Sequence, residues 1–111
     1  DLAMSLSPLD PLHYAMLATR AFTHMSVNED AEAARWAERG ARAPGAHVLI
    51  GVIAGVAHTL AGDAVRADYW ADNVRQRNDA LTRAVFFRSF PLKSDPLRAR
   101  LDGALLRMGI R

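Results

Sequence analysis

Residues 24–38 read HMSVNEDAEAARWAE, and residues 58–72, which lie 34 positions later, read HTLAGDAVRADYWAD. Both stretches begin with histidine, have alanine at the tenth place and end in Trp-Ala followed by an acid. The chain has two tryptophans, Trp36 and Trp70, and this offset brings them into register. A unit repeated after 34 residues is therefore predicted.

Small residues recur where the two helices of each unit would cross. Antiparallel helices approach closely only where their facing side chains are small. The small positions are Ala21, Ala33, Ala37, Gly40, Gly55, Ala67 and Ala71. Asn28 and Gly62 coincide at the turns, and both residue types tolerate a left-handed conformation. One such helix pair cannot bury its apolar face alone, so neighbouring pairs are expected to stack.

Prolines, glycines and capping residues divide the chain into helical segments. Asp10 followed by Pro11 is typical of a capped helix start, and this helix is expected to end near Ser26. Asp95 repeats this start before the last helix. The further helices are predicted over residues 29–43, 46–60, 64–78, 79–90 and 97–108. The helix over 46–60 is apolar nearly all round and should be the most buried. No run alternates with a period of two, so the prediction is an all-α chain.

Helix–turn–helix units of 34 residues are the signature of the tetratricopeptide (TPR) family, and the chain resembles this family over residues 11–78. The usual aromatic near the start of each unit is absent, and the proline that ends the first unit comes one residue early. The resemblance implies a TPR-like solenoid, a right-handed superhelix of helical hairpins. The implied organisation is the tail of a truncated repeat over 1–10, one repeat over 11–45, a second over 46–78, and a degenerate repeat with a C-terminal capping helix over 79–111.

The two ends of the chain carry a narrower resemblance. Residues 6–11 (LSPLDP), 90–101 (FPLKSDPLRARL) and 103–110 (GALLRMGI) look like the C-terminal TPR region of bacterial multidomain signalling proteins. In that group the region follows a class III adenylate cyclase domain or a winged-helix DNA-binding domain. No cyclase or winged-helix residues are present here, so neither activity carries over. Because the chain does not begin with Met and has no signal-peptide pattern, we read it as a segment of a longer protein.

The sequence contains no pattern that indicates catalysis. The absence of cysteine excludes a disulfide framework, thiolate metal sites and a cysteine nucleophile. There is no phosphate loop, dinucleotide fingerprint or nucleophile elbow. His13 and His24, like His47 and His58, are too far apart along one helix to share an ion. Pairing of His24 with His58 across helices is an alternative, but a packing role at the seam between units is favoured. We therefore predict a non-enzymatic segment with no metal and no cofactor.

Binding in this family usually uses the concave surface, which is lined by the first helix of each pair. Transfer by register gives a largely apolar groove: Ala18, Phe22, Met25, Val52, Val56, Thr59, Arg83, Phe86 and Phe90. Its apolar character disfavours a ligand held by its C-terminal carboxylate. An exposed apolar groove would accept a helix or an extended peptide. In the alternative interpretation, the last helix folds back and fills the groove.

The charge pattern does not point to nucleic acid. The chain has 14 Lys and Arg against 12 Asp and Glu, a net charge of +2. Its densest basic cluster is Arg66, Arg75, Arg77, Arg83 and Arg88. These arginines are expected to pair on solvated helix faces with Asp68, Asp72 and Asp79. An accessory contact with nucleic acid through this cluster is kept as an alternative.

The expected partner is a protein or peptide, including the upstream domain of the same protein. Self-association that pairs two upstream domains is the other alternative, as a homodimer. Trp36 and Trp70 could form an aromatic cage, but a place at the convex seam between units is favoured. The apolar run over residues 46–61 is too short to cross a membrane. A cytoplasmic, regulatory module is therefore predicted.

Overall fold

The computed structural model describes residues 11–111. The expected tail over residues 1–10, with its Asp10 cap, lies outside the described residues. The elements are α2 (Pro11–Ser26), α3 (Asp30–Ala41), α4 (Val48–Ala61), α5 (Ala64–Arg77), α6 (Arg83–Ser89) and α7 (Asp95–Arg107). Every regular element among the described residues is a helix, so the predicted all-α class is confirmed.

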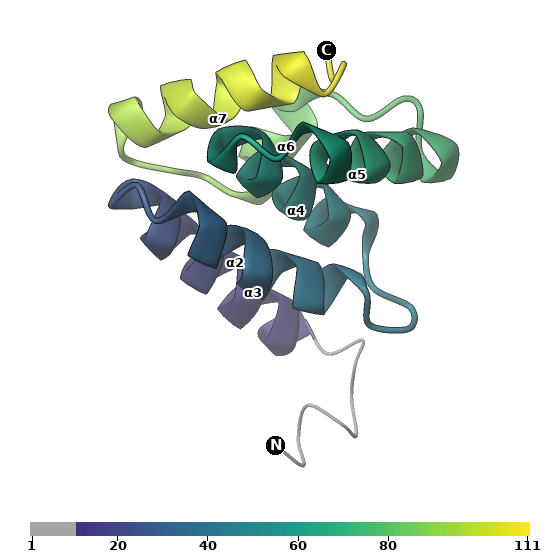
Figure 1. The fold of residues 1–111 in the computed structure, drawn as a ribbon, viewed down its shortest axis with the longest axis horizontal. Helices are drawn as coiled ribbons and strands as arrows, with labels where there is room; N and C mark the ends of the chain where they lie inside the picture. Colours follow the sequence, from purple (N-terminus) through teal and green to yellow (C-terminus); the bar gives the residue numbers. More distant parts are fainter. Residues whose placement is uncertain (1–10) are drawn as a thin grey trace.

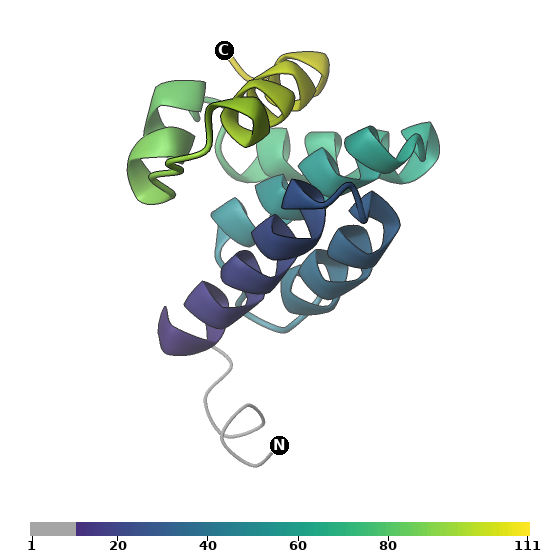
Figure 2. The ribbon, with the colours of Figure 1, turned by 90° about the vertical axis from the view of Figure 1, so that its left-hand side faces the viewer.

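The helices lie in three layers, and α4 is in the central layer, as Figures 1 and 2 show. The antiparallel pair α2–α3 forms one layer, the pair α4–α5 forms the next, and α6 with α7 covers the remaining side of α4. Residues 50–58 of α4 are all buried, which confirms that this helix is the centre of the core. Within residues 11–111 no helix combines the length and hydropathy that a membrane crossing requires.

The turns inside the first two pairs have the same backbone hydrogen bonds. The N–H of Glu29 donates to the carbonyl of His24 at 2.8 Å, and the N–H of Asp63 donates to the carbonyl of His58 at 2.9 Å. One residue of each turn has a positive φ: Asn28 (63°) and Gly62 (82°). The 34-residue offset therefore relates the backbone geometry of the turns as well as the side chains, as predicted.

Close helix crossings explain the small residues. A Cβ added at Gly40 would come within 2.5 Å of Leu17 Cδ1, and one added at Gly55 would lie 3.3 Å from Trp70 Cβ and collide with the Met108 side chain. The other small positions are buried as well: Ala21, Ala33, Ala37, Ala67 and Ala71. Larger side chains would push these helices apart, since interior packing leaves no spare volume.

Three helices start later, or on a different cap, than the sequence suggested. The caps are His47 for α4, Thr82 for α6 and Ser94 for α7. The expected starts were residue 46, residue 79 and a cap at Asp95. In each case the observed side chain accepts a backbone N–H of the first turn, which satisfies one unpaired donor. Asn78 Oδ1 also accepts the N–H of Ala80 at 3.1 Å, which keeps the following residues in a turn.

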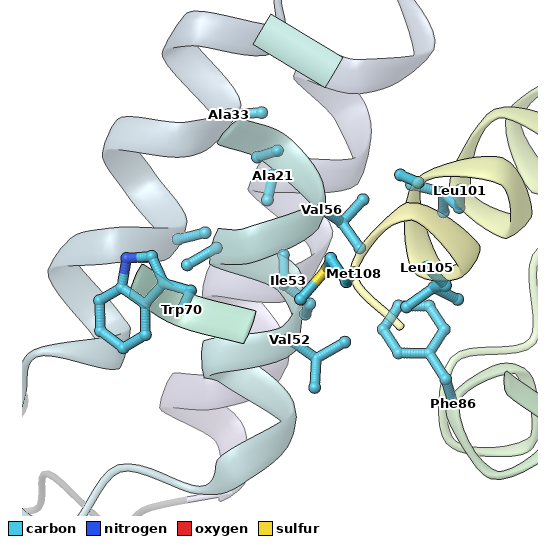
Figure 3. Packing of buried hydrophobic residues seen from close by; sticks show 14 of the residues in the cluster. Ala21, Ala33, Val52, Ile53, Val56, Trp70, Phe86, Leu101, Leu105 and Met108 are labelled. Atoms are coloured by element: carbon cyan, nitrogen blue, oxygen red, sulfur yellow. The ribbon is translucent and has the colours of Figure 1, made fainter. Parts of the chain in front are cut away.

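The last helix packs back onto the second pair. Figure 3 shows Leu101 and Leu105 of α7, with the C-cap residue Met108, on the side of α4 that carries Ile53 and Val56. All five side chains are buried. Burial of this apolar surface drives the return of α7.

Polar contacts then hold α7 across the end of the first pair. Arg100 donates to the carbonyl of Met25 and to Asp30 Oδ2, each at 2.7 Å. Arg83 at the start of α6 donates to Asp102 Oδ1 at 2.7 Å, which joins α6 to α7. The terminal helices are thus tied to both earlier pairs and to each other.

Candidate functional site

The predicted concave groove is largely covered in the structure. Five of its nine residues are buried: Ala18, Met25, Val52, Val56 and Phe86. The other four are partly exposed: Phe22, Thr59, Arg83 and Phe90. The structure therefore does not show an open groove over these residues. It shows the alternative arrangement, because α7 returns and buries its apolar stripe against α4.

A depression of about 380 Å³ remains between α2 and the segment that follows α6. It is lined by Ala18, Thr19, Phe22, Ser89, Phe90, Pro91 and Leu92. The Phe22 ring packs edge-on against Phe90 at 5.4 Å and Phe86 at 6.4 Å between ring centroids. This lining offers apolar contact area but no charged group that would select a partner.

The covered seam between the first and second pairs is centred on Glu38 of α3. Trp70 Nε1 donates to Glu38 Oε1 at 3.1 Å, and His58 Nε2 lies 3.1 Å from the same oxygen. Arg66 donates to Glu38 Oε2 at 3.4 Å. Because these partners come from α4 and α5, one carboxylate joins the first pair to the second.

The surroundings of Glu38 keep its carboxylate ionised. Burial in the seam raises the pKa of Glu38, but hydrogen bonds from Trp70 and His58 and the positive charge of Arg42 together outweigh burial. The pKa of Glu38 is therefore lowered from its ordinary value of 4.5. An ionised carboxylate held by several donors suits an anchor between two packed elements.

The two histidines at matching repeat positions, His24 and His58, lie in different surroundings. His58 is buried and faces Glu38, in the seam role that the sequence favoured. His24 contacts a different acid, with Nδ1 at 2.9 Å from Glu29 Oε1. The two histidines thus have separate carboxylate partners. Among the described residues, no three acidic or histidine side chains are grouped so that they could hold a metal ion.

The outer face of the first pair has a hollow of about 720 Å³, called here the α2–α3 face. Its lining is Met16, Leu17, Thr19, Arg20, Thr23, His24 and Trp36. A shift of 34 residues gives the corresponding positions of the second pair: Ile50, Gly51, Ile53, Ala54, Ala57, His58 and Trp70. Every one of these counterparts is buried, in a pair whose corresponding face is covered by α3. Within residues 11–111, the first pair therefore leaves most of this surface uncovered, with Leu17 buried, whereas the second pair uses its own to bind α3.

The two tryptophans show the same relation. Trp70 is 3% exposed and donates to Glu38. Trp36 is partly exposed, with the guanidinium of Arg20 4.3 Å from its ring centroid and that of Arg39 at 5.3 Å. The indoles sit at matching places on the second helix of each pair, but within the described residues a neighbouring pair covers Trp70 and leaves Trp36 partly exposed.

The α2–α3 face was missed by the sequence reasoning, which looked for binding residues on the concave side. The signal was present in the repeat. Thr19, Arg20 and Thr23 are the counterparts of three apolar residues in the second pair: Ile53, Ala54 and Ala57. Polar residues at positions that are apolar in the next unit indicate a face that meets water.

The predicted arginine cluster is mostly engaged within the chain. Arg66 pairs with Glu38 and Asp63, and Arg75 pairs with Asp72, as predicted for that arginine. Arg77 donates to the carbonyl of Ala46, and Arg83 pairs with Asp102. Arg88 is exposed. Arg66, Arg77 and Arg83 therefore join different elements, whereas Arg75 pairs within α5.

Comparisons with protein-family models, with curated proteins and with solved structures found no match. What the helices establish is an all-α chain in which the pairs α2–α3 and α4–α5 are related by a 34-residue offset.

Proposed function

We propose that this chain is a non-catalytic protein-binding module of the TPR type that serves as a regulatory segment of a larger bacterial signalling protein. The 34-residue unit and its repeated turn geometry support the TPR type. The resemblance of the two ends to the C-terminal region of such signalling proteins supports the setting. The module would hold a segment of a partner protein, including the upstream domain of its own chain.

The observation that carries this proposal is the α2–α3 face. Its seven lining residues are the counterparts of seven residues that are buried in the second pair. The second pair uses this face to receive α3. An α-helix of a partner is therefore the natural ligand of the same face on the first pair, in the manner of helix-in-groove recognition.

The composition of the α2–α3 face suits a partner that binds reversibly. Met16 is 66% exposed and supplies apolar contact area. Thr19, Arg20 and Thr23 add polar groups where the permanently covered second pair has apolar ones. Interfaces that form and dissociate are more polar than permanent ones, because each side must also be stable in water.

The proposal is tested with a defined helix. The probe is a fluorescein-labelled, N-acetylated and C-amidated peptide with the sequence of residues 29–42, because α3 is the helix that the second pair receives. Its binding to the full 111-residue chain is measured by fluorescence anisotropy. We expect saturable binding that Met16→Glu weakens by about tenfold or more, since a charge would be placed in an apolar contact.

The matched control is Leu106→Glu on α7, because Leu106 is also an exposed apolar residue, at 53%. This variant should bind the peptide like the unaltered chain. Far-UV circular dichroism checks that both variants stay helical. A chain that shows no saturable binding, or equal weakening by both substitutions, would contradict the proposed function.

A further inference from the structure

We propose that the α2–α3 face selects an alanine-lined helix that carries a glutamate, and that His24, Trp36 and Arg20 receive this carboxylate. This inference rests on the proposed function and names the chemistry of the partner. It is argued from the way in which the second pair receives α3.

The template is the docking of α3 on α4 and α5. The contact surface of α3 is made of small side chains, with Ala34 and Ala37 both buried. Among them stands Glu38, whose carboxylate meets His58 and Trp70 at 3.1 Å each. The alanines let the helices approach closely, and the glutamate supplies the polar anchor of the seam.

The first pair contains the same receiving groups. His24 and Trp36 are the counterparts of His58 and Trp70, and both line the hollow. The observed contact of His24 uses Nδ1 toward Glu29, whereas His58 presents Nε2 to Glu38. The nitrogen that corresponds to the receiving atom of His58 is therefore Nε2, and the contact with Glu29 uses the other ring nitrogen of His24.

The charges of the α2–α3 face differ from those of the template, because the counterpart of Arg66, which donates to Glu38, is Glu32, and Glu32 pairs with Arg35. Arg20 stands where the second pair has Ala54, and its guanidinium lies 4.3 Å from the centre of the Trp36 ring. Arg39 lies over the same ring at 5.3 Å. Of these two arginines, Arg20 lines the hollow, so its guanidinium is the one available there to an incoming carboxylate. Such complementarity selects partners by charge.

A second copy of the chain fits this face less well. In that case α5 would be the donor helix, because it is the counterpart of α3. Where α3 presents Ala34, α5 has the charged Asp68, and Asp72, the counterpart of Glu38, is paired with Arg75. A partner helix with alanines around its glutamate is therefore favoured over self-association.

The experiment compares three labelled peptides in the anisotropy assay with the full chain. They are the peptide of residues 29–42, the same peptide with Glu38→Gln, and the same peptide with Glu32→Gln as the control of equal charge. Each is titrated against the unaltered chain, the Arg20→Gln variant and the matched Arg35→Gln variant, since Arg35 is exposed and lies outside the hollow.

The expected result is that Glu38→Gln in the peptide weakens binding to the unaltered chain about tenfold, whereas Glu32→Gln changes it little. The difference between the unsubstituted peptide and its Glu38→Gln form should shrink in the Arg20→Gln chain and persist in the Arg35→Gln chain. This pattern would show that one carboxylate is read by the α2–α3 face.

Two other results would overturn the inference in different ways. Equal binding of all three peptides would leave helix docking in place and remove the glutamate requirement. If none of the three peptides binds, the proposed docking function is contradicted as well. Sedimentation of the chain alone is run beside the titrations, and a dimer that Arg20→Gln dissociates would assign the α2–α3 face to a second copy instead.

Discussion

The first and second helix pairs have a histidine and a tryptophan at the same positions of the repeat, but these side chains differ in burial and in contact partners between the pairs. In the second pair, His58 and Trp70 are buried and both contact the carboxylate of Glu38 on α3. In the first pair, His24 and Trp36 lie at the edge of a hollow, and arginines flank the indole. Repeat position thus sets where a side chain points, and the presence of a neighbouring pair sets whether it is buried.

This difference teaches how a stacked helical fold turns a structural contact into a binding surface. The seam that joins two pairs is an interface between helices of one chain. Within residues 11–111 no further pair covers the same positions of the first pair, and a few substitutions, such as Arg20 for the counterpart of Ala54, make them compatible with water. The predictions below test the contrast between the covered seam and the α2–α3 face.

The largest difference is expected between the two tryptophans. Trp70→Ala should lower the free energy of unfolding by about 3–5 kcal/mol, because it removes a buried indole and a donor to Glu38. Trp36→Ala should cost about 1 kcal/mol, since its ring is only partly buried. Urea unfolding followed by far-UV circular dichroism measures both values. Equal losses would break the contrast between the two pairs.

A smaller effect is expected from the anchor of the seam. Glu38→Gln should lower the free energy of unfolding by about 2 kcal/mol, because charge-assisted contacts with His58 and Trp70 are weakened in a mostly buried place. Glu32→Gln is the control, since Glu32 pairs with Arg35 at the surface and should change stability by about 0.5 kcal/mol or less. The same urea titration measures both variants. A loss of free energy of unfolding for Glu38→Gln that is as small as that for Glu32→Gln would contradict the anchoring role of Glu38.

Helix spacing at the core can be tested with two glycines. Gly55→Ala should lower the free energy of unfolding by about 1 kcal/mol, because the added methyl group meets Met108 and Trp70. Gly103→Ala in α7 should raise the free energy of unfolding by up to about 1 kcal/mol. A Cβ added there would have the Arg107 side chain 3.9 Å away, which is an ordinary contact, and alanine favours a helix. Thermal unfolding of the two variants gives the signs, and a stabilising Gly55→Ala would show that the crossing is looser than described.

The smallest effect is on pH dependence. The pKa of Glu38 is lower in the folded chain than its ordinary value of 4.5, so its ionisation adds stability above that value. This contribution is lost as the pH falls through the lower, folded pKa. The difference in free energy of unfolding between the unaltered chain and Glu38→Gln should therefore narrow on acidification. A difference that stays constant from neutral pH to the onset of acid unfolding would show that the charge of Glu38 has no part in the seam.

Much of the local structure was predictable from residue type and spacing. Asn28 and Gly62 marked the turns because few other residues tolerate a positive φ. Small residues such as Gly55 marked the crossings, because a side chain there has no room. The caps were harder to predict, since Ser94 and Asp95 are both capping residue types and His47 is not one of the usual ones.

The long-range arrangement was not predictable in the same way. Leu101 and Leu105 form an apolar stripe that fits several neighbours equally well, and the sequence does not say which face of α4 it covers. The contact of Arg100 with Asp30 joins residues that are 70 positions apart, so no local pattern indicates it. The groove was expected by transfer from the family resemblance, and the return of the last helix could be stated from the sequence only as the alternative.

The most direct test of the central claim is a proton–nitrogen NMR spectrum of the nitrogen-15-labelled chain during titration with the unlabelled peptide of residues 29–42. Because the peptide has a tryptophan of its own, labelling the chain alone restricts the spectrum to the two indole N–H groups of the chain. Trp36 and Trp70 give separate signals that can be assigned with Trp36→Phe. We predict that the Trp36 signal shifts progressively to saturation and that the Trp70 signal stays in place. A shift of Trp70 alone, or no shift of either signal, would contradict the account of the α2–α3 face as an open helix-binding surface.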